Sequence, residues 1–178
     1  MTVFQALVLG ILQGLAEFLP ISSSAHLALA PWVFGWSEPG LAVDVALHVG
    51  TLVAVLVYFR DEWMRLLVAA FEIARTQRIE GVEQRRVLYL IVATIPGAIA
   101  GVLLNDYAES TFRSPALIAS ALAVMGVVLW YVDRTRPADR PIESLGWSDA
   151  ILIGIAQAAA LLPGVSRSGA TITAGRAL

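Results

Sequence analysis

The sequence predicts an all-α protein that crosses a membrane several times, and three observations support this fold class. Hydrophobic residues make up 58% of the 178 residues, while only 15% are charged. A soluble domain carries about a quarter charged residues, and a chain of this length cannot hide so much apolar surface within itself. Three long apolar stretches can cross a bilayer, and two shorter ones run into clusters of Pro, Ser and Gly.

Three stretches have the length and composition of spanning helices, namely residues 41–59, 87–104 and 114–132. The first carries a single acid, Asp44, and the other two carry no charge. About 20 apolar residues cross the hydrocarbon core of a bilayer, so each stretch is close to the required length. We therefore expect three spans within a single membrane domain that covers residues 1–178.

Two further apolar stretches are too short to span and end in residues that break helices. Residues 3–16 lead to Glu17 and Pro20, and residues 150–165 lead to a Ser-Arg-Ser triplet. Irregular backbone at membrane depth needs cover from protein or water, and short interrupted segments in two halves of a chain mark a midplane site. We expect two re-entrant helix–loop–helix hairpins, the first over residues 3–35.

The two short stretches are also related to each other. A shift of 144 residues aligns seven identical residues within twenty-one positions. The matched pairs are Ala6/Ala150, Gly10/Gly154, Ile11/Ile155, Gln13/Gln157, Ala16/Ala160, Ser22/Ser166 and Ser24/Ser168. Residues 1–144 would then form a first repeat, and residues 145–178 would begin a second one.

The distribution of basic residues predicts how the chain crosses the bilayer. Segment 60–86 carries six Arg, whereas the loop 105–113 carries two acids against one Arg. Arg-rich loops stay in the cytoplasm, so the acidic loop is expected outside. Because three spans separate the matching hairpins, the first would enter from outside and the second from the cytoplasm. This arrangement is an inverted-topology repeat.

The first broken segment holds a cluster of residues that can carry chemistry. Glu17 lies one helical turn after Gln13, and Ser22-Ser23-Ser24 and His26 follow. An ionisable residue inside a membrane segment is costly and marks a functional site by default, although Glu17 could also sit at the water interface. One serine would cap the next helix. A carboxylate, a hydroxyl and an imidazole so close together offer an acid, a nucleophile and a base.

The second broken segment, Pro163–Thr171, predicts an anion site. A new helix is expected near Ser168, with its free N–H groups directed into the loop, where a phosphate would bind. Arg167 suits bidentate phosphate binding; the alternative is an arginine that snorkels to the interface. The expected substrate contacts are Ser22 from the first segment and Ser166, Arg167, Ser168, Gly169 and Thr171 from the second.

Asp44 and His48 are four residues apart and share a helix face. They could line the same cavity as Glu17, or form a local pair near the outer interface, which we favour. An anion-binding loop that faces a carboxylate, serine and histidine at membrane depth suits phosphoryl transfer from an amphiphilic phosphate ester, with a metal ion to help neutralise charge.

Residues Gln13–His26 resemble the first signature of the bacterial undecaprenyl-diphosphate phosphatases of the bacitracin-resistance type, and Pro163–Thr171 resembles the second, Pro-Gly-x-Ser-Arg-Ser-Gly-x-Thr. Residues Asp44–Val57 and the Ile95-Pro96-Gly97 turn are also similar to that family. The resemblance covers essentially the whole chain. It implies an inner-membrane phosphatase, active on the extracytoplasmic side, that releases phosphate from undecaprenyl diphosphate, recycles the cell-wall carrier lipid and confers bacitracin resistance.

The resemblance also implies roles for individual residues. Glu17 would be the essential acid, Ser23 the nucleophile and His26 its neighbour, while Arg167 and Ser166 would hold the diphosphate with support from Thr171. A divalent cation, Mg²⁺ or Ca²⁺, would bind at Glu17 and Gln13, although Gln13 supplies only a neutral amide. The family fold has further spans after the second signature. By symmetry, roughly a hundred residues would follow it, so we expect the C-terminal part to be missing.

Two alternatives to a phosphatase stay open at this point. The inverted repeat is more usual in transporters, which favours a flippase for polyprenyl phosphate or a transporter of another anion. A purely structural membrane subunit is the third reading, and the ionisable residues count against it. A net charge of −2 argues against a nucleic-acid partner, and the lack of cysteine excludes disulfides and thiolate sites. Whether two copies form a homodimer is left open.

Overall fold

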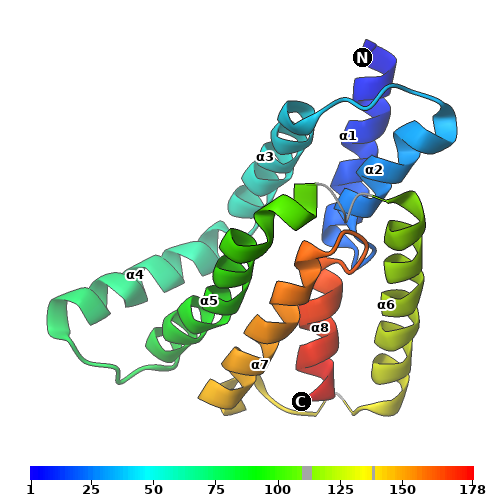
Figure 1. The fold of residues 1–178 in the computed structure, drawn as a ribbon. Helices are drawn as coiled ribbons and strands as arrows, with labels where there is room; N and C mark the ends of the chain where they lie inside the picture. Colours follow the sequence, from blue (N-terminus) through cyan, green and yellow to red (C-terminus); the bar gives the residue numbers. More distant parts are fainter. Residues whose placement is uncertain (110–113, 138) are drawn as a thin grey trace.

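The computed structural model describes residues 1–109, 114–137 and 139–178, and this part of the chain is all-α. Its elements are α1 (Val3–Phe18), α2 (Ser23–Phe34), α3 (Leu41–Tyr58), α4 (Arg60–Thr76), α5 (Val82–Glu109), α6 (Pro115–Thr135), η2 (Ile142–Ser144), α7 (Trp147–Ala158), η3 (Ala159–Leu161) and α8 (Arg167–Ala177). Figure 1 shows the N-terminus and the C-terminus at opposite ends of the molecule.

Three helices are long and apolar enough to cross a bilayer: α3, α5 over Val82–Leu104, and α6. They confirm the predicted all-α membrane class. The chain is thus a multi-pass membrane protein. Helix α5 begins five residues before the predicted span. Its first turns carry Glu83, Arg85 and Arg86, charged residues that a search for apolar runs leaves out but that an N-terminal helical turn accommodates at the membrane surface.

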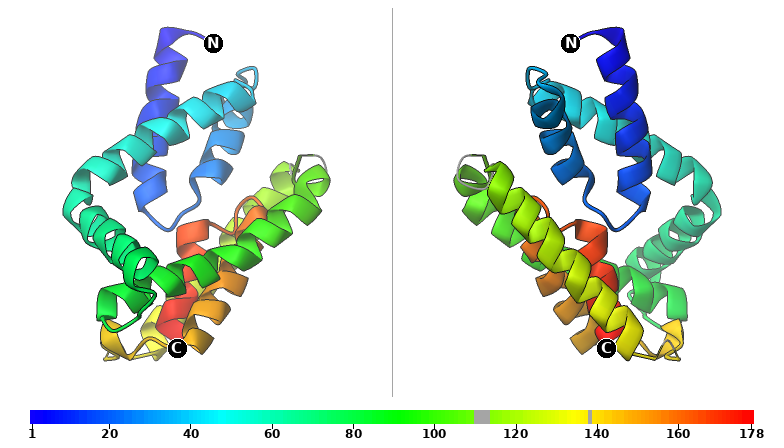
Figure 2. Two further views of the ribbon diagram at one scale, coloured as in Figure 1. Left: turned by 90° about the vertical axis from the view of Figure 1, so that its left-hand side faces the viewer. Right: turned by 90° about the vertical axis from the view of Figure 1, so that its right-hand side faces the viewer.

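Two helical hairpins approach each other tip to tip in the middle of the molecule. Figure 2 shows the α1–α2 hairpin descending from one end and the α7–α8 hairpin rising from the other. Helix α7 packs against α5, and α8 packs against α6. Helix α1 packs against α3, and α2 also reaches α6. The three long helices therefore hold both hairpin tips at the same level.

The turns of the two hairpins have the same local geometry. Each α-helix after the turn begins with a serine at its N-cap, Ser22 with φ 67° and Ser166 with φ 64°. Each serine Oγ accepts a hydrogen bond from the N–H three residues on, that of Ala25 (3.4 Å) or Gly169 (3.1 Å). A serine side chain that caps its own helix stabilises a backbone conformation that is otherwise strained for a non-glycine residue.

Segment 60–86, predicted as an Arg-rich loop, contains helix α4 instead. The apolar residues of α4 recur every three or four positions, which is an amphipathic pattern that a search for spanning helices overlooks. The predicted acidic loop 105–113 lies only partly in the described structure. Residues 105–109 end α5, and residues 110–113 lie outside the described residues.

Candidate active site

A cavity of about 440 Å³ lies between the two hairpin tips and helix α3. Both hairpins and α3 line it. Its lining is Ala16, Glu17, Ser22, Ser23, Ser24, His48, Gln157, Ala160, Leu161, Pro163, Ser166, Arg167, Ser168 and Thr171. Residues more than 140 positions apart in the sequence therefore meet around one space, as the repeat and the anion loop require.

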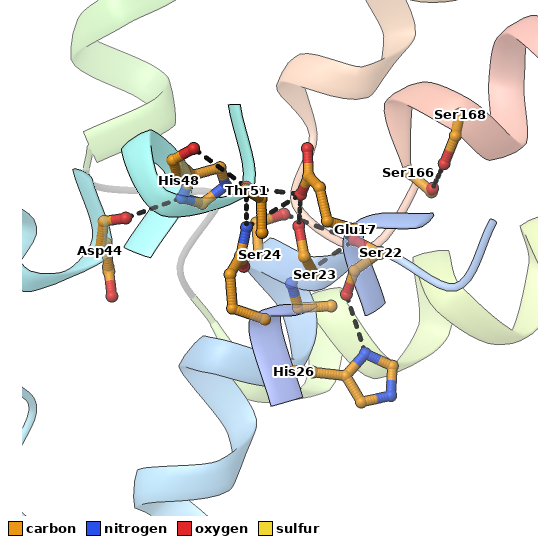
Figure 3. Close-up of polar contacts among 12 residues, drawn as sticks. Glu17, Ser22, Ser23, Ser24, His26, Asp44, His48, Thr51, Ser166 and Ser168 are labelled. Carbon is orange, nitrogen blue, oxygen red and sulfur yellow. Dashed lines mark hydrogen bonds and ion pairs between the residues drawn. The ribbon is translucent and has the colours of Figure 1, made fainter. Parts of the chain in front are cut away.

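Glu17 is the centre of a hydrogen-bond network at this cavity (Figure 3). The hydroxyl of Ser23 donates to Glu17 Oε2. Gln13 Nε2 donates to the same oxygen at 3.1 Å and to Thr51 Oγ1 at 3.4 Å. Gln13 is 1% exposed and Thr51 is buried, so the network anchors the carboxylate from the protein side. Glu17 itself stays about one-third exposed, with its carboxylate accessible from the cavity.

His48 also faces Glu17, from helix α3. Its Nδ1 lies 2.7 Å from the carbonyl oxygen of Asp44, and its Nε2 lies 3.8 Å from Glu17 Oε2. Because Nδ1–H donates to a carbonyl, Nε2 is the atom presented to the carboxylate. Of the two alternatives for His48, the structure confirms that it lines the same cavity as Glu17, while its local contact is with the Asp44 backbone.

The second hairpin supplies a positive surface to the same cavity. The side chain of Arg167 is exposed and lines the cavity, and its guanidinium makes no hydrogen bond or ion pair to any residue that the structure describes. Arg167 is the first residue of α8, so its own N–H and that of Ser168 have no partner within the helix. A guanidinium and a helix N-terminus are donors suited to an anion, and the surface they share with Ser166, Ser168 and Thr171 is here called the anion-binding corner.

Three side chains of this corner, those of Ser166, Ser168 and Thr171, are already occupied by local hydrogen bonds. The hydroxyls of Ser166 and Ser168 lie 3.1 Å apart. Thr171 Oγ1 lies 2.9 Å from the Arg167 carbonyl oxygen and 3.2 Å from that of Ser168. The hydroxyl proton of Thr171 is thus used within α8, and only its oxygen can accept a further bond at the cavity.

Comparisons with known proteins identify the family of the chain. The family model described as bacitracin resistance protein BacA matches residues 6–178. The chain belongs to the BacA family. Curated relatives named undecaprenyl-diphosphatase are 63% identical in Gemmatimonas aurantiaca and 53% identical in Pelotomaculum thermopropionicum, each over the whole chain. A third relative of that name, from Moorella thermoacetica, is 53% identical over 98% of the chain.

The chain spans about two thirds of the length of these BacA relatives, namely 67%, 66% and 65%. Both signature segments and all three spans fall within the matched part. The site described above is therefore built from a region that this chain shares with its relatives.

Three predicted site residues of this BacA-family chain do not line the cavity: Gln13, which is buried and bonds Glu17, His26 and Gly169. His26 Nδ1 lies 2.8 Å from the carbonyl oxygen of Ser22, and its ring points away from Glu17 (Figure 3). Gly169 is buried behind the anion-binding corner, where an added Cβ would lie 3.0 Å from Ser166 Cβ and 3.4 Å from the Pro20 carbonyl oxygen. Gly169 thus lets the two hairpin tips approach each other.

Sequence reasoning missed Thr51 as a partner of Gln13, and it left open whether His48 lines the cavity. Thr51 and His48 lie on the same span, three residues apart, and Thr51 Oγ1 also bonds the His48 carbonyl oxygen at 2.9 Å. A polar residue spaced three from a histidine within an apolar span was the available signal. Nothing in the sequence tells which face of that span meets Glu17.

Proposed function

We propose that this chain hydrolyses undecaprenyl diphosphate to undecaprenyl phosphate and phosphate. The proposal rests on two groups that line the same cavity. On one side, the hydroxyl of Ser23 donates a hydrogen bond to Glu17. On the other side lies the unpaired guanidinium of Arg167, at the N-terminus of α8. The names of the relatives support the substrate. The lipid setting also suits it, because the prenyl chain can stay in the bilayer while the diphosphate enters the cavity.

In the proposed reaction, Ser23 Oγ attacks the terminal phosphorus and its proton passes to Glu17 Oε2. A bond forms between Ser23 Oγ and phosphorus, and the bond to the bridging oxygen breaks, so that undecaprenyl phosphate leaves. Water then hydrolyses the phosphoserine and releases phosphate. Arg167 and the N-terminal N–H groups of α8 stabilise the charge on the transferring group. The competing route has water as the attacking group, with Glu17 as its base and Ser23 orienting it.

The donor set also fits a divalent cation that binds together with the diphosphate. Glu17 is the one carboxylate that lines the cavity in the described part of the chain, and that part contains no group of three His, Asp or Glu side chains arranged to hold a metal. Gln13 Oε1 is buried without a hydrogen-bond partner among the described residues, so it is a second oxygen beside Glu17. Mg²⁺ or Ca²⁺ can be held by a carboxylate plus substrate phosphates, and would add charge neutralisation.

We also propose that the two hairpins are re-entrant and form an inverted-topology repeat in the bacterial inner membrane, with the site open to the extracytoplasmic side. The matching N-cap serines with positive φ at a spacing of 144 residues support the repeat. The six Arg of segment 60–86 support the orientation.

A second candidate function is movement of polyprenyl phosphate across the bilayer. The hairpins that meet tip to tip from opposite ends favour it, because such an arrangement places one site between two faces. Liposomes separate the two functions. Transbilayer movement of polyprenyl phosphate in vesicles that release no phosphate from the diphosphate would support transport instead of hydrolysis. Cross-linking in the same vesicles would show whether two copies associate.

The decisive experiment is release of phosphate from undecaprenyl diphosphate by the purified chain in detergent, with and without Mg²⁺ or Ca²⁺. Glu17→Gln and Arg167→Ala should each lower kcat by about 100-fold or more, the size typical for loss of a catalytic base or of a charge-stabilising donor. Glu80→Gln and Arg78→Ala are matched controls, because both side chains are about three-quarters exposed and lie far from the cavity in sequence and contacts. If Glu17→Gln and Arg167→Ala both keep wild-type rates, the site assignment is wrong.

Trapping of a phosphorylated intermediate would show whether Ser23 or water is the attacking group. A chain quenched during turnover should carry phosphate on Ser23, and Ser23→Ala should carry none. Full activity of Ser23→Ala would assign the attack to water.

A further inference from the structure

Helix α4 carries four large apolar side chains on one face that the described part of the chain leaves more than half exposed. Met64, Leu67, Val68 and Phe71, here called the α4 stripe, follow the i, i+3, i+4, i+7 spacing of a single helix face. Their exposed fractions lie between 51% and 68%. Figure 1 shows α4 projecting sideways from the end of α3, at the periphery of the molecule.

The opposite face of α4 is attached to the start of α5. Glu62 Oε1 accepts from Arg86 Nη2 at 3.1 Å, and Gln84 Nε2 donates to Glu72 Oε2 at 3.0 Å. Ala69 is buried between these polar contacts. The contacts set the rotation of α4 about its axis, so the outward direction of the stripe is a fixed property of the fold.

Helix α4 cannot itself cross the bilayer. It has 17 residues, and six of them are charged: Arg60, Asp61, Glu62, Arg65, Glu72 and Arg75. Charged side chains at the centre of a bilayer are strongly disfavoured. A helix with one apolar face, one charged face and low overall hydrophobicity lies in the plane of the membrane interface.

The position of α4 along the chain points to lipid as the partner. Phe59 alone separates α4 from the membrane span α3, so the stripe begins where the lipid-facing surface of that span ends. Tyr58, Phe59 and Trp63 cluster at this corner and are all exposed, as aromatic residues at a bilayer–water boundary are. A groove of about 520 Å³ between α4 and α5, with Met64, Val68 and Val82 in its lining, continues the apolar surface.

We propose that α4 lies in the headgroup region of the bilayer, with the α4 stripe inserted among lipid acyl chains at the end of α3. Apolar insertion holds it there. Segment 60–86 carries six Arg and five acids, so its net charge is only +1 and anionic lipids are not required. The helix fixes the depth of the connection between two spans, independently of the reaction at the cavity.

Spin labels test this placement directly, because the chain contains no cysteine to remove. Leu67→Cys and Phe71→Cys would carry a nitroxide on the stripe. Glu80→Cys, in the connection between α4 and α5, is the water-exposed control, because its side chain is 75% exposed. In phosphatidylcholine vesicles, the ratio of collisions with oxygen to collisions with a water-soluble nickel chelate should be severalfold higher at 67 and 71 than at 80.

Two results would overturn the proposal. A ratio at 67 and 71 equal to that at 80 would place the stripe in water. Labels shielded from both reagents would show that protein, a second copy included, covers the stripe instead of lipid. Met64→Cys provides a further label on the stripe if one of the other variants fails to fold.

Discussion

Three side chains approach a single carboxylate oxygen atom of Glu17. Ser23, Gln13 and His48 all approach Oε2, from α2, from α1 itself and from α3. The carboxylate is thus held from three elements at once, and a change in any one of them can displace it. Activity should therefore depend on residues that never touch the substrate, Gln13 and Thr51 among them.

Substitution of the two histidines of the chain, His48 and His26, should affect activity and stability differently. His48→Ala should lower kcat by about 2- to 5-fold, because it removes a polar neighbour that lies 3.8 Å from Glu17 Oε2, and such a partly exposed contact is worth roughly 0.2–1 kcal/mol. His26→Ala removes a hydrogen bond to the backbone of Ser22 and should lower Tm together with any loss of activity. Parallel measurements of kcat and Tm on both variants check this. Wild-type kcat in His48→Ala would contradict it.

At the scale of elements, the two hairpins differ in how tightly they are held. Helix α7 approaches α5 so closely that a Cβ on Gly154 would lie 2.7 Å from the Ala93 carbonyl oxygen. The repeat partner, Gly10, meets only Leu47 Cδ2, at 3.8 Å. The α7–α8 hairpin is therefore held by close backbone contact between α7 and α5, whereas α1 leaves space for a Cβ atom beside Gly10.

Because of this difference, a glycine-to-alanine substitution should be tolerated at Gly10 but not at Gly154. Gly154→Ala should destabilise the chain by roughly 1–3 kcal/mol, because the overlap is with backbone that cannot move aside easily. Gly10→Ala should leave stability unchanged or raise it slightly, because alanine favours a helix over glycine. Thermal unfolding of both variants in detergent measures the effect. Equal Tm values for the two variants would show that the α5–α7 contact is looser than described.

The attachment of α4 predicts a pH dependence. Hydrogen bonds from Arg65 and then Arg86 hold the pKa of Glu62 below the ordinary glutamate range. A carboxyl group whose folded-state pKa is lowered stabilises the fold above its unfolded pKa, near pH 4.3, and loses this contribution as pH falls through the lowered value.

Acidification should therefore loosen α4 from α5. Amide hydrogen exchange in α4 should speed up below about pH 4 in the wild type. In Glu62→Gln it should be faster already at neutral pH and change less on acidification. An identical pH profile in both chains would remove Glu62 from the attachment.

For the whole molecule, the orientation in the membrane decides from which side substrate reaches the cavity. Ser24 lines the cavity, and the connection between α4 and α5 contains Arg78. In intact cells, Ser24→Cys should react with a membrane-impermeant maleimide, and Arg78→Cys should react only after permeabilisation. The reverse pattern would place the site on the cytoplasmic side.

Sequence patterns were sufficient to predict the spans and the breaks in the hairpins, but not the rotation of α3 about its axis or the presence of α4. Apolar length located α3, α5 and α6, because crossing a bilayer demands it. Pro20 and Pro163 located the breaks in the hairpins. The rotation of α3 about its axis depends on packing, so the sequence left open whether His48 or His26 faces Glu17. Helix α4 was missed because its longest apolar run, Leu66–Phe71, is far too short to span a bilayer and has a charged residue on each side.

The crowding of donors at Glu17 Oε2 has a spectroscopic consequence. No hydrogen bond to Glu17 Oε1 occurs within the described chain, so the two C–O bonds of this carboxylate are unequally polarised. The antisymmetric and symmetric stretching bands of Glu17 should therefore be split differently from those of a freely hydrated glutamate. Isotope-edited infrared difference spectra should show this splitting change when a divalent cation binds the second oxygen.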